Sequence, residues 1–150
     1  MDDTQTDTPP SHVGPRPEFA DGTDAARQSV ISPVQTHGLD SDLRRALVAR
    51  ICAMAGQDDL AARYRAEMQD TTFAVIAEGA EAGTDPFLAA ILRHADHVTA
   101  RPIDSTAAHI TALEDAGLTA AQIVALSELI AFANYHARVH AGLALLGAPS

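Results

Sequence analysis

The 150-residue sequence contains one cysteine, Cys52, and neither tryptophan nor lysine. A single cysteine excludes an intramolecular disulfide and any Cys-x-x-Cys site within the chain. Aromatic residues make up only 4% of the sequence. Since strands are usually rich in aromatic and β-branched side chains, a sheet-rich core is disfavoured. The N-terminus has neither a basic region nor an apolar run, and we therefore expect no secretory signal.

Basic residues are also few: ten arginines face twenty acidic residues, and the formal net charge is −10. A protein that binds the phosphate backbone of nucleic acids needs a basic stripe, and a protein that docks on anionic lipids needs a basic cluster. The sequence also lacks an uncharged apolar run of about 18 residues, which a transmembrane helix requires. We therefore expect a cytoplasmic protein with no nucleic-acid partner and no membrane association.

Alanine, by contrast, is abundant: the chain holds 31 alanines, and alanine is the best helix former. Beyond residue 38, apolar positions recur at three- and four-residue spacing, and capping residues and glycines separate the periodic segments. Two good start signals are Asp85 before Pro86 and Thr119 three residues before Gln122. The sequence predicts an all-α fold of about six helices, at about residues 41–55, 58–68, 73–82, 85–99, 104–117 and 120–146.

Residues 1–38 differ from the rest of the chain. They contain five of the eight prolines and six acidic residues, and they show no helical periodicity. Such a segment buries too little apolar surface to offset the entropy of ordering it. We therefore predict a mostly disordered N-terminal tail over residues 1–38 and a helical domain over residues 39–150. The tail is interpreted as inert, with a partner-docking arm as the alternative.

The last predicted helix is apolar around more than half of its circumference. A helix of this kind is either central in its bundle or packed against another subunit. Because the chain has few large aromatic residues, oligomerisation would add buried apolar surface that it otherwise lacks. We therefore predict a homo-oligomer with this helix near the interface. A monodisperse monomer in light scattering would contradict this prediction.

Two pairs of histidines are candidates for a site. His136 and His140 lie four residues apart on the apolar face of the last helix, so both side chains can reach one point, as metal ligands on a helix do. The simpler interpretation is a pair of hydrogen-bonded core or interface histidines. His94 and His97 form a second pair, which we interpret as part of a solvated polar face. A metal site would require the pairs to meet in space.

Two stretches of the chain resemble the carboxymuconolactone decarboxylase-like superfamily, which includes the alkylhydroperoxidase AhpD proteins. They are residues 110–124, ITALEDAGLTAAQIV, and residues 129–139, LIAFANYHARV. Arg101-Pro102 before them is similar to a peroxidase-related branch of that superfamily, often labelled only "CMD domain protein". The resemblance covers about residues 40–147. It implies an AhpD-like helical bundle that forms obligate oligomers such as trimers or hexamers.

The redox motif of that family is missing from this chain. Active AhpD-type members carry a glutamate, a Cys-x-x-Cys twelve residues later, and a histidine four residues after the second cysteine. The matching positions here are Arg45, Gln57, Leu60 and Tyr64. Cys52 lies five residues too early and has no resolving partner, so we interpret it as a buried, unreactive thiol. The resemblance therefore implies a protein that would be labelled a peroxidase-related oxidoreductase but that lacks the thiol mechanism of the active family members.

Three functional hypotheses follow. The first is an AhpD-like protein that has lost the dithiol, needs no cofactor, and serves as a scaffold, a small-molecule binder or a subunit partner of an active paralogue. The second is an acid–base enzyme of the decarboxylase or lyase type that uses Glu128, His136 and His140. The third is a metal-dependent protein that uses the histidine pairs. We favour the first.

Overall fold

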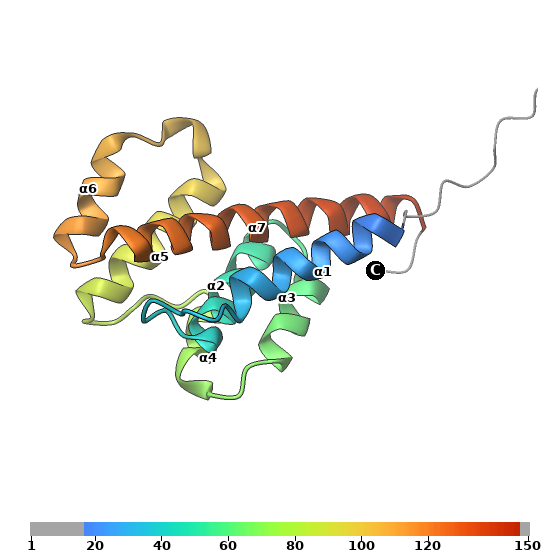
Figure 1. Cartoon of the computed structure of the whole chain (residues 1–150), viewed down its shortest axis with the longest axis horizontal. Coiled ribbons are helices and arrows are strands. Elements are labelled where there is room, and N and C mark those ends of the chain that lie inside the picture. Colours follow the sequence, from blue (N-terminus) through green and yellow to red (C-terminus); the bar gives the residue numbers. More distant parts are fainter. Residues whose placement is uncertain (1–16, 148–150) are drawn as a thin grey trace, which may run out of the picture.

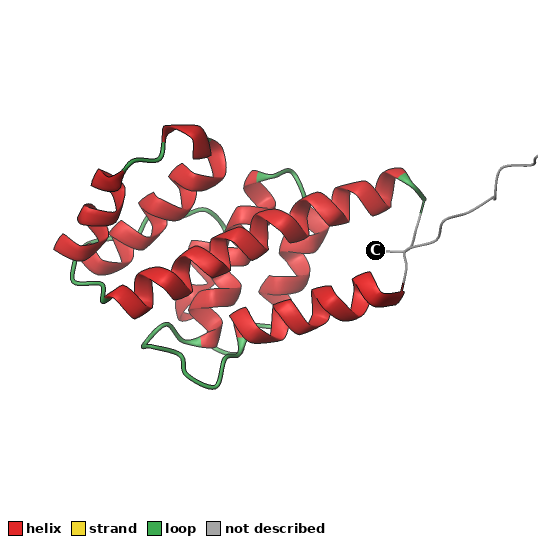
Figure 2. Cartoon of the chain, turned by 45° about the horizontal axis from the view of Figure 1, so that its top comes forward, coloured by secondary structure: helices red, strands yellow, loops and turns green. Residues whose placement is uncertain are grey.

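The computed structural model describes residues 17–147, and side chains from residue 21 onward. Within that range all regular secondary structure is helical and there is no strand, which confirms the all-α prediction (Figures 1 and 2). The elements are α1 (Pro17–Ile31), α2 (Ser41–Met54), α3 (Asp58–Ala66), the 3-10 helix η1 (Thr71–Phe73), α4 (Ala74–Ala77), α5 (Pro86–Ala100), the 3-10 helix η2 (Pro102–Asp104), α6 (Ala107–Asp115) and α7 (Ala120–Leu145).

Two predicted helix starts are confirmed by their caps. The Asp85 carboxylate accepts hydrogen bonds from the first-turn amides of α5, and Pro86 occupies the first turn. At the start of α7, the Thr119 amide donates to Gln122 Oε1 at 2.9 Å, and the Gln122 amide donates back to Thr119 Oγ1 at 3.3 Å. These reciprocal bonds form the capping box that the Thr119–Gln122 spacing predicts.

Two other predicted boundaries differ. The helix expected over residues 73–82 is only η1 followed by α4, because the chain turns at Gly79, which has a φ of +96°. The helix expected from residue 104 begins instead at Ala107. Residues Pro102–Asp104 form a 3-10 turn, and the N-cap of α6 is Thr106.

The prediction of an irregular tail over residues 1–38 is not met in its second half. Residues 17–31 form α1, which packs against α7 and α2 (Figure 1). The buried Arg44 guanidinium donates to the backbone carbonyls of Val30 at 2.8 Å, Thr36 at 2.9 Å and Leu39 at 2.7 Å. The segment is thus ordered by tertiary hydrogen bonds, which periodicity does not reveal. Residues 1–16 of the predicted tail lie outside the described residues.

The core is built around α2, whose residues 46–52 are almost completely buried. Helix α7 runs the length of the molecule, with α5 and α6 near one end and α1 and α3 toward the other (Figure 1). It contacts α1, α2, α5 and α6, so its wide apolar surface is central to the bundle of one chain. The homo-oligomer stays a prediction.

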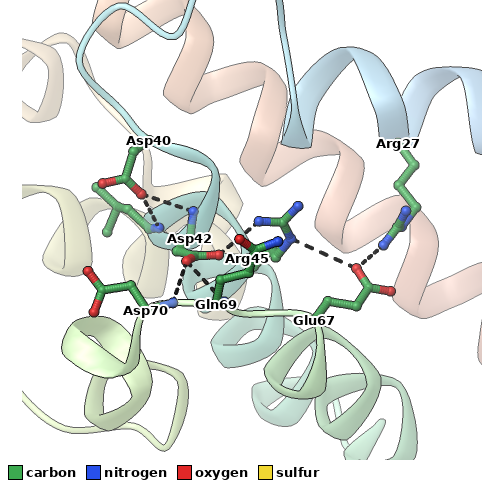
Figure 3. Close-up of polar contacts among 8 residues, drawn as sticks. Arg27, Asp40, Asp42, Arg45, Glu67, Gln69 and Asp70 are labelled. Atoms are coloured by element: carbon green, nitrogen blue, oxygen red, sulfur yellow. Dashed lines mark hydrogen bonds and ion pairs between the residues drawn. The ribbon is translucent and has the colours of Figure 1, made fainter.

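A polar network joins α1, α2 and α3 on one side of the core (Figure 3). Asp42 accepts hydrogen bonds from the Asp70 amide at 2.7 Å and from Arg45 at 2.8 Å. Burial alone would raise the pKa of the Asp42 carboxyl, but these donors outweigh it, so the pKa lies below its ordinary value. Glu67 in turn pairs with Arg27 of α1. The network thus fixes the N-terminal helix on the bundle.

No helix among residues 17–147 is long and apolar enough to cross a membrane. Even α7, which has 26 residues, fails this criterion. It carries Glu128, Arg138 and two histidines along its length.

Candidate functional site

The predicted histidines of α7 are each engaged by a different residue of α3. His136 Nδ1 lies 2.8 Å from the Tyr64 hydroxyl, and the Phe132 ring packs on the imidazole with 5.3 Å between ring centres. Burial, followed by the charge of His140, lowers the pKa of His136 below its ordinary value. His136 is therefore a packed, hydrogen-bonded histidine, as the simpler interpretation of the sequence expects.

His140 is buried and bonds to Asp59 of α3, with 2.9 Å between Nε2 and Oδ2. The hydrogen bond from His140 lowers the pKa of the Asp59 carboxyl. The partners of the two histidines are thus a phenol and a carboxylate at separate positions of one helix. These contacts join α7 to α3.

Glu128 lies elsewhere on α7. It precedes His136 by eight residues and His140 by twelve, which corresponds to about 12 Å and 18 Å along a helix axis. Its exposed side chain lines a shallow cavity of about 490 Å³ together with Arg44, and no residue of α3 lines that cavity. The three residues predicted as an acid–base set are therefore not brought together.

Cys52 is completely buried in α2. Burial raises the pKa of its thiol to about 12, so the thiol is essentially protonated near neutral pH. The two positions that the resemblance would match to redox cysteines also hold no thiol: Leu60 is a buried core residue, and Gln57 precedes α3. The burial expected for Cys52 is confirmed.

The second histidine pair lies in a different environment from the one predicted. His94 is only 9% exposed, and His97 is partly buried, so this part of α5 is not a solvated polar face. His94 Nδ1 and His97 Nε2 are both inaccessible to solvent and have no hydrogen-bond partner among the described residues. Buried polar atoms are normally paired, so two unpaired ring nitrogens on neighbouring turns of α5 are unusual.

Both histidines line a cavity of about 450 Å³ between α5 and α6, which we call the histidine cavity. His109, from the first turn of α6, completes the group, and its ring stacks on that of His97 with 4.2 Å between ring centres. The other residues that line it are Met54, Ala90, Arg93, Asp96, Ala100, Arg101, Ala112 and Leu113.

Sequence reasoning did not single out His109. It stands three residues after Thr106, and its Nδ1 accepts a hydrogen bond from the Thr106 amide at 2.9 Å, which closes the N-cap of α6. The spacing of Thr106 and His109 is that of a capping box, with histidine in place of the usual Glu or Gln. That spacing could have located the start of α6, but only the tertiary fold brings His109 against His97.

The histidine cavity lies beside a partly buried ion pair. Arg50 of α2 donates from Nε and Nη2 to the two carboxylate oxygens of Asp96, each at 2.7 Å. The hydrogen bond with Asp96 raises the pKa of Arg50. Arg50 also donates to the Ala80 carbonyl at 2.7 Å, so α5 is held on α2 and on the loop after α4.

Metal binding has no geometric support in the part of the chain that the structure describes. No group of three or more His, Cys, Asp or Glu side chains there could hold a metal ion. His136 and His140 contact α3, whereas His94 and His97 line the histidine cavity. The convergence that a metal site would require is therefore not found.

The arrangement is chemically suited to binding. The histidine cavity is lined by three histidines, two arginines and apolar side chains, and its volume falls in the range of about 300–1,000 Å³ typical of small-molecule sites. Comparison with known proteins adds no family: no protein-family model, curated protein or solved structure matches this chain.

Proposed function

We propose that this chain is an AhpD-like protein by descent that binds a small molecule in the histidine cavity and has no thiol peroxidase activity. The observation that carries the proposal is that His94 and His97, each with a buried and unpartnered ring nitrogen, are among the residues that line a cavity large enough for an organic ligand. The proposal includes a trimeric or hexameric homo-oligomer, which the family resemblance implies, and a cytoplasmic location, which the sequence leads us to expect.

The burial of Cys52 supports the non-thiol half of the proposal. A peroxidatic cysteine needs an accessible thiolate, commonly at a helix start or beside a cation, and a second thiol to resolve the sulfenic acid. Cys52 instead lies in the interior of α2 with a raised pKa, and the chain has no second cysteine.

The acid–base alternative has less support. Its residues Glu128, His136 and His140 lie in two separate places, and both histidines already have hydrogen-bond partners on α3. General acid–base catalysis needs the acid and the base within reach of one substrate. The binding hypothesis requires no such rearrangement.

Nuclear magnetic resonance of the full chain labelled with ¹⁵N-histidine tests the proposal. The probes are benzoate, benzamide and benzyl alcohol, added separately at millimolar concentration. We expect at least one probe to shift the ring signals of His94, His97 and His109 while those of His136 and His140 stay in place. Shifts confined to His136 and His140, or no shift with any probe, would contradict the proposal.

A further inference from the structure

The histidine cavity is more positively charged than the chain as a whole. The chain carries a formal net charge of −10, yet two arginines, Arg93 and Arg101, and one acid, Asp96, line this cavity. Both carboxylate oxygens of Asp96 are occupied by Arg50. Because that ion pair compensates Asp96, the two lining guanidinium groups leave the cavity with a local excess of positive charge.

The three imidazoles add hydrogen-bonding capacity to this positive surface. The Nδ1 atom of His109 accepts from the Thr106 amide, so a neutral His109 carries its proton on Nε2 and can donate there. His94 Nδ1 and His97 Nε2 are unpaired, and His94 is nine-tenths buried. An acidic group can accept hydrogen bonds from His109 Nε2 and from guanidinium, whereas a cation would be repelled by Arg93 and Arg101.

The rest of the wall is apolar. Met54 and Leu113 contribute larger side chains, and the stacked rings of His97 and His109 add flat surface. Three alanines, Ala90, Ala100 and Ala112, leave space. A cavity of about 450 Å³ is much larger than an inorganic ion needs, and its apolar part would stay unfilled with such an ion.

We infer that the histidine cavity binds a small organic anion, in which one acidic group is attached to a compact apolar body. The acidic group meets Arg93, Arg101 and the imidazoles, and the apolar body lies against the alanine wall. This inference rests on the proposed function and adds the chemical class of its ligand.

Isothermal titration calorimetry of the full chain tests the inference with matched probes. Benzoate, benzenesulfonate and phenyl phosphate carry different acidic groups on one ring, benzamide and benzyl alcohol are neutral, and inorganic phosphate lacks the ring. We expect the best of the three organic anions to bind at least about tenfold more tightly than either neutral probe and than inorganic phosphate. The ranking among the three identifies the acidic group.

Variants then locate the site. The double variant Arg93→Gln/Arg101→Gln is expected to lose about tenfold in affinity for the best anion, and Ala112→Phe to weaken it by filling space. Arg138→Gln, at an exposed position of α7 outside the cavity, is the matched control and keeps the affinity. Circular dichroism confirms that each variant is folded.

Three results would overturn the inference: benzamide binding as tightly as benzoate, inorganic phosphate binding as tightly as phenyl phosphate, or Arg138→Gln weakening binding as much as the double variant. These outcomes are separable from failure of the proposed function. If neutral probes shift the His94, His97 and His109 signals but no anion is preferred, the cavity is a binding site and only the ligand class is wrong.

Discussion

The thiol of Cys52 shows how one residue's position decides its chemistry. Cysteine is a good nucleophile only as the thiolate, and burial in an apolar helix interior disfavours the charged form. With its pKa raised to about 12, only about one Cys52 in 10⁵ is ionised at pH 7. The same residue type at an exposed helix start would be reactive.

We therefore predict that native Cys52 reacts with 5,5′-dithiobis(2-nitrobenzoate) at least about 100-fold more slowly than it does in guanidinium chloride. Consumption of a hydroperoxide in the presence of a dithiol reductant should be equal for the unmodified chain and for Cys52→Ala. Peroxide reduction that disappears in Cys52→Ala, with helix content unchanged, would show that the thiol is catalytic after all.

The hydrogen-bond partners of the histidines do not follow from their spacing along the helices. From the sequence, His136 and His140 are the more promising pair, because four-residue spacing on an apolar face suggests a shared target. In the structure each bonds to its own α3 residue, and it is His94 and His97 that keep unpaired nitrogens. Spacing predicts which side chains share a helix face, but it does not predict which neighbouring helix supplies their partners.

At the scale of the helix, the start of α7 is stabilised both by hydrogen bonds within its first turn and by a hydrogen bond to a distant segment of the chain. The Gln122 side chain completes the capping box through Oε1, and its Nε2 donates to the His37 carbonyl at 2.8 Å. Residues His37 and Gly38 have φ values of +52° and +78°, so this turn is conformationally unusual. Gln122 thus links the first turn of α7 to the segment that follows α1.

We predict that Gln122→Ala lowers the free energy of unfolding by about 1–2 kcal/mol, since it removes the side-chain half of the capping box and the tether to His37. Gln122→Glu retains an acceptor for the Thr119 amide and removes only the donor to His37. It should therefore lose less, about 0.5–1.5 kcal/mol. Urea denaturation measures both values, and equal destabilisation by the two variants would argue against a separate role for the tether.

At the scale of the whole molecule, buried histidines make stability depend on pH. Burial first, and then neighbouring histidines, lower the pKa of His94 and His136 below their ordinary value of 6.5. The charged or titratable groups around His94 are Arg93, Asp96, His97, Arg101 and His109, and those around His136 are Asp24, Arg27, Arg63, Tyr64 and His140.

Since the folded chain holds these two protons less tightly, the unfolded chain binds more protons once the pH falls below about 6.5. We therefore predict that the free energy of unfolding is highest above about pH 6.5 and decreases between about pH 6.5 and pH 5. The lowered carboxyl pKa values of Asp42, Asp59 and Asp70 act only near or below 3.8, outside this window.

Urea titrations across that pH range measure this slope. The double variant His94→Gln/His136→Gln should flatten it, and His37→Asn, at an exposed turn position, should leave it unchanged. A slope that survives in the double variant would show that other groups control the acid sensitivity.

The sequence by itself determined the secondary structure of most of this protein. Alanine content, periodic apolar positions and the caps at Asp85 and Thr119 act within one turn of the chain, so they predict the class of fold and most helices from residue 41 onward. The cysteine count alone likewise excludes a dithiol mechanism within one chain, because such a mechanism needs two thiols.

Only the tertiary structure decided which side chains meet. Arg44 bonds to the carbonyls of Val30 in α1 and of Thr36 after it, and the histidine cavity is lined by residues of α5, α6 and the end of α2. Such contacts join residues far apart in the chain, and they depend on packing angles and on burial that local propensity does not specify. For that reason the sequence predicts His94 and His97 as a pair but not the residues that surround them. The packing of α6 on α5 is what brings His109 against His97.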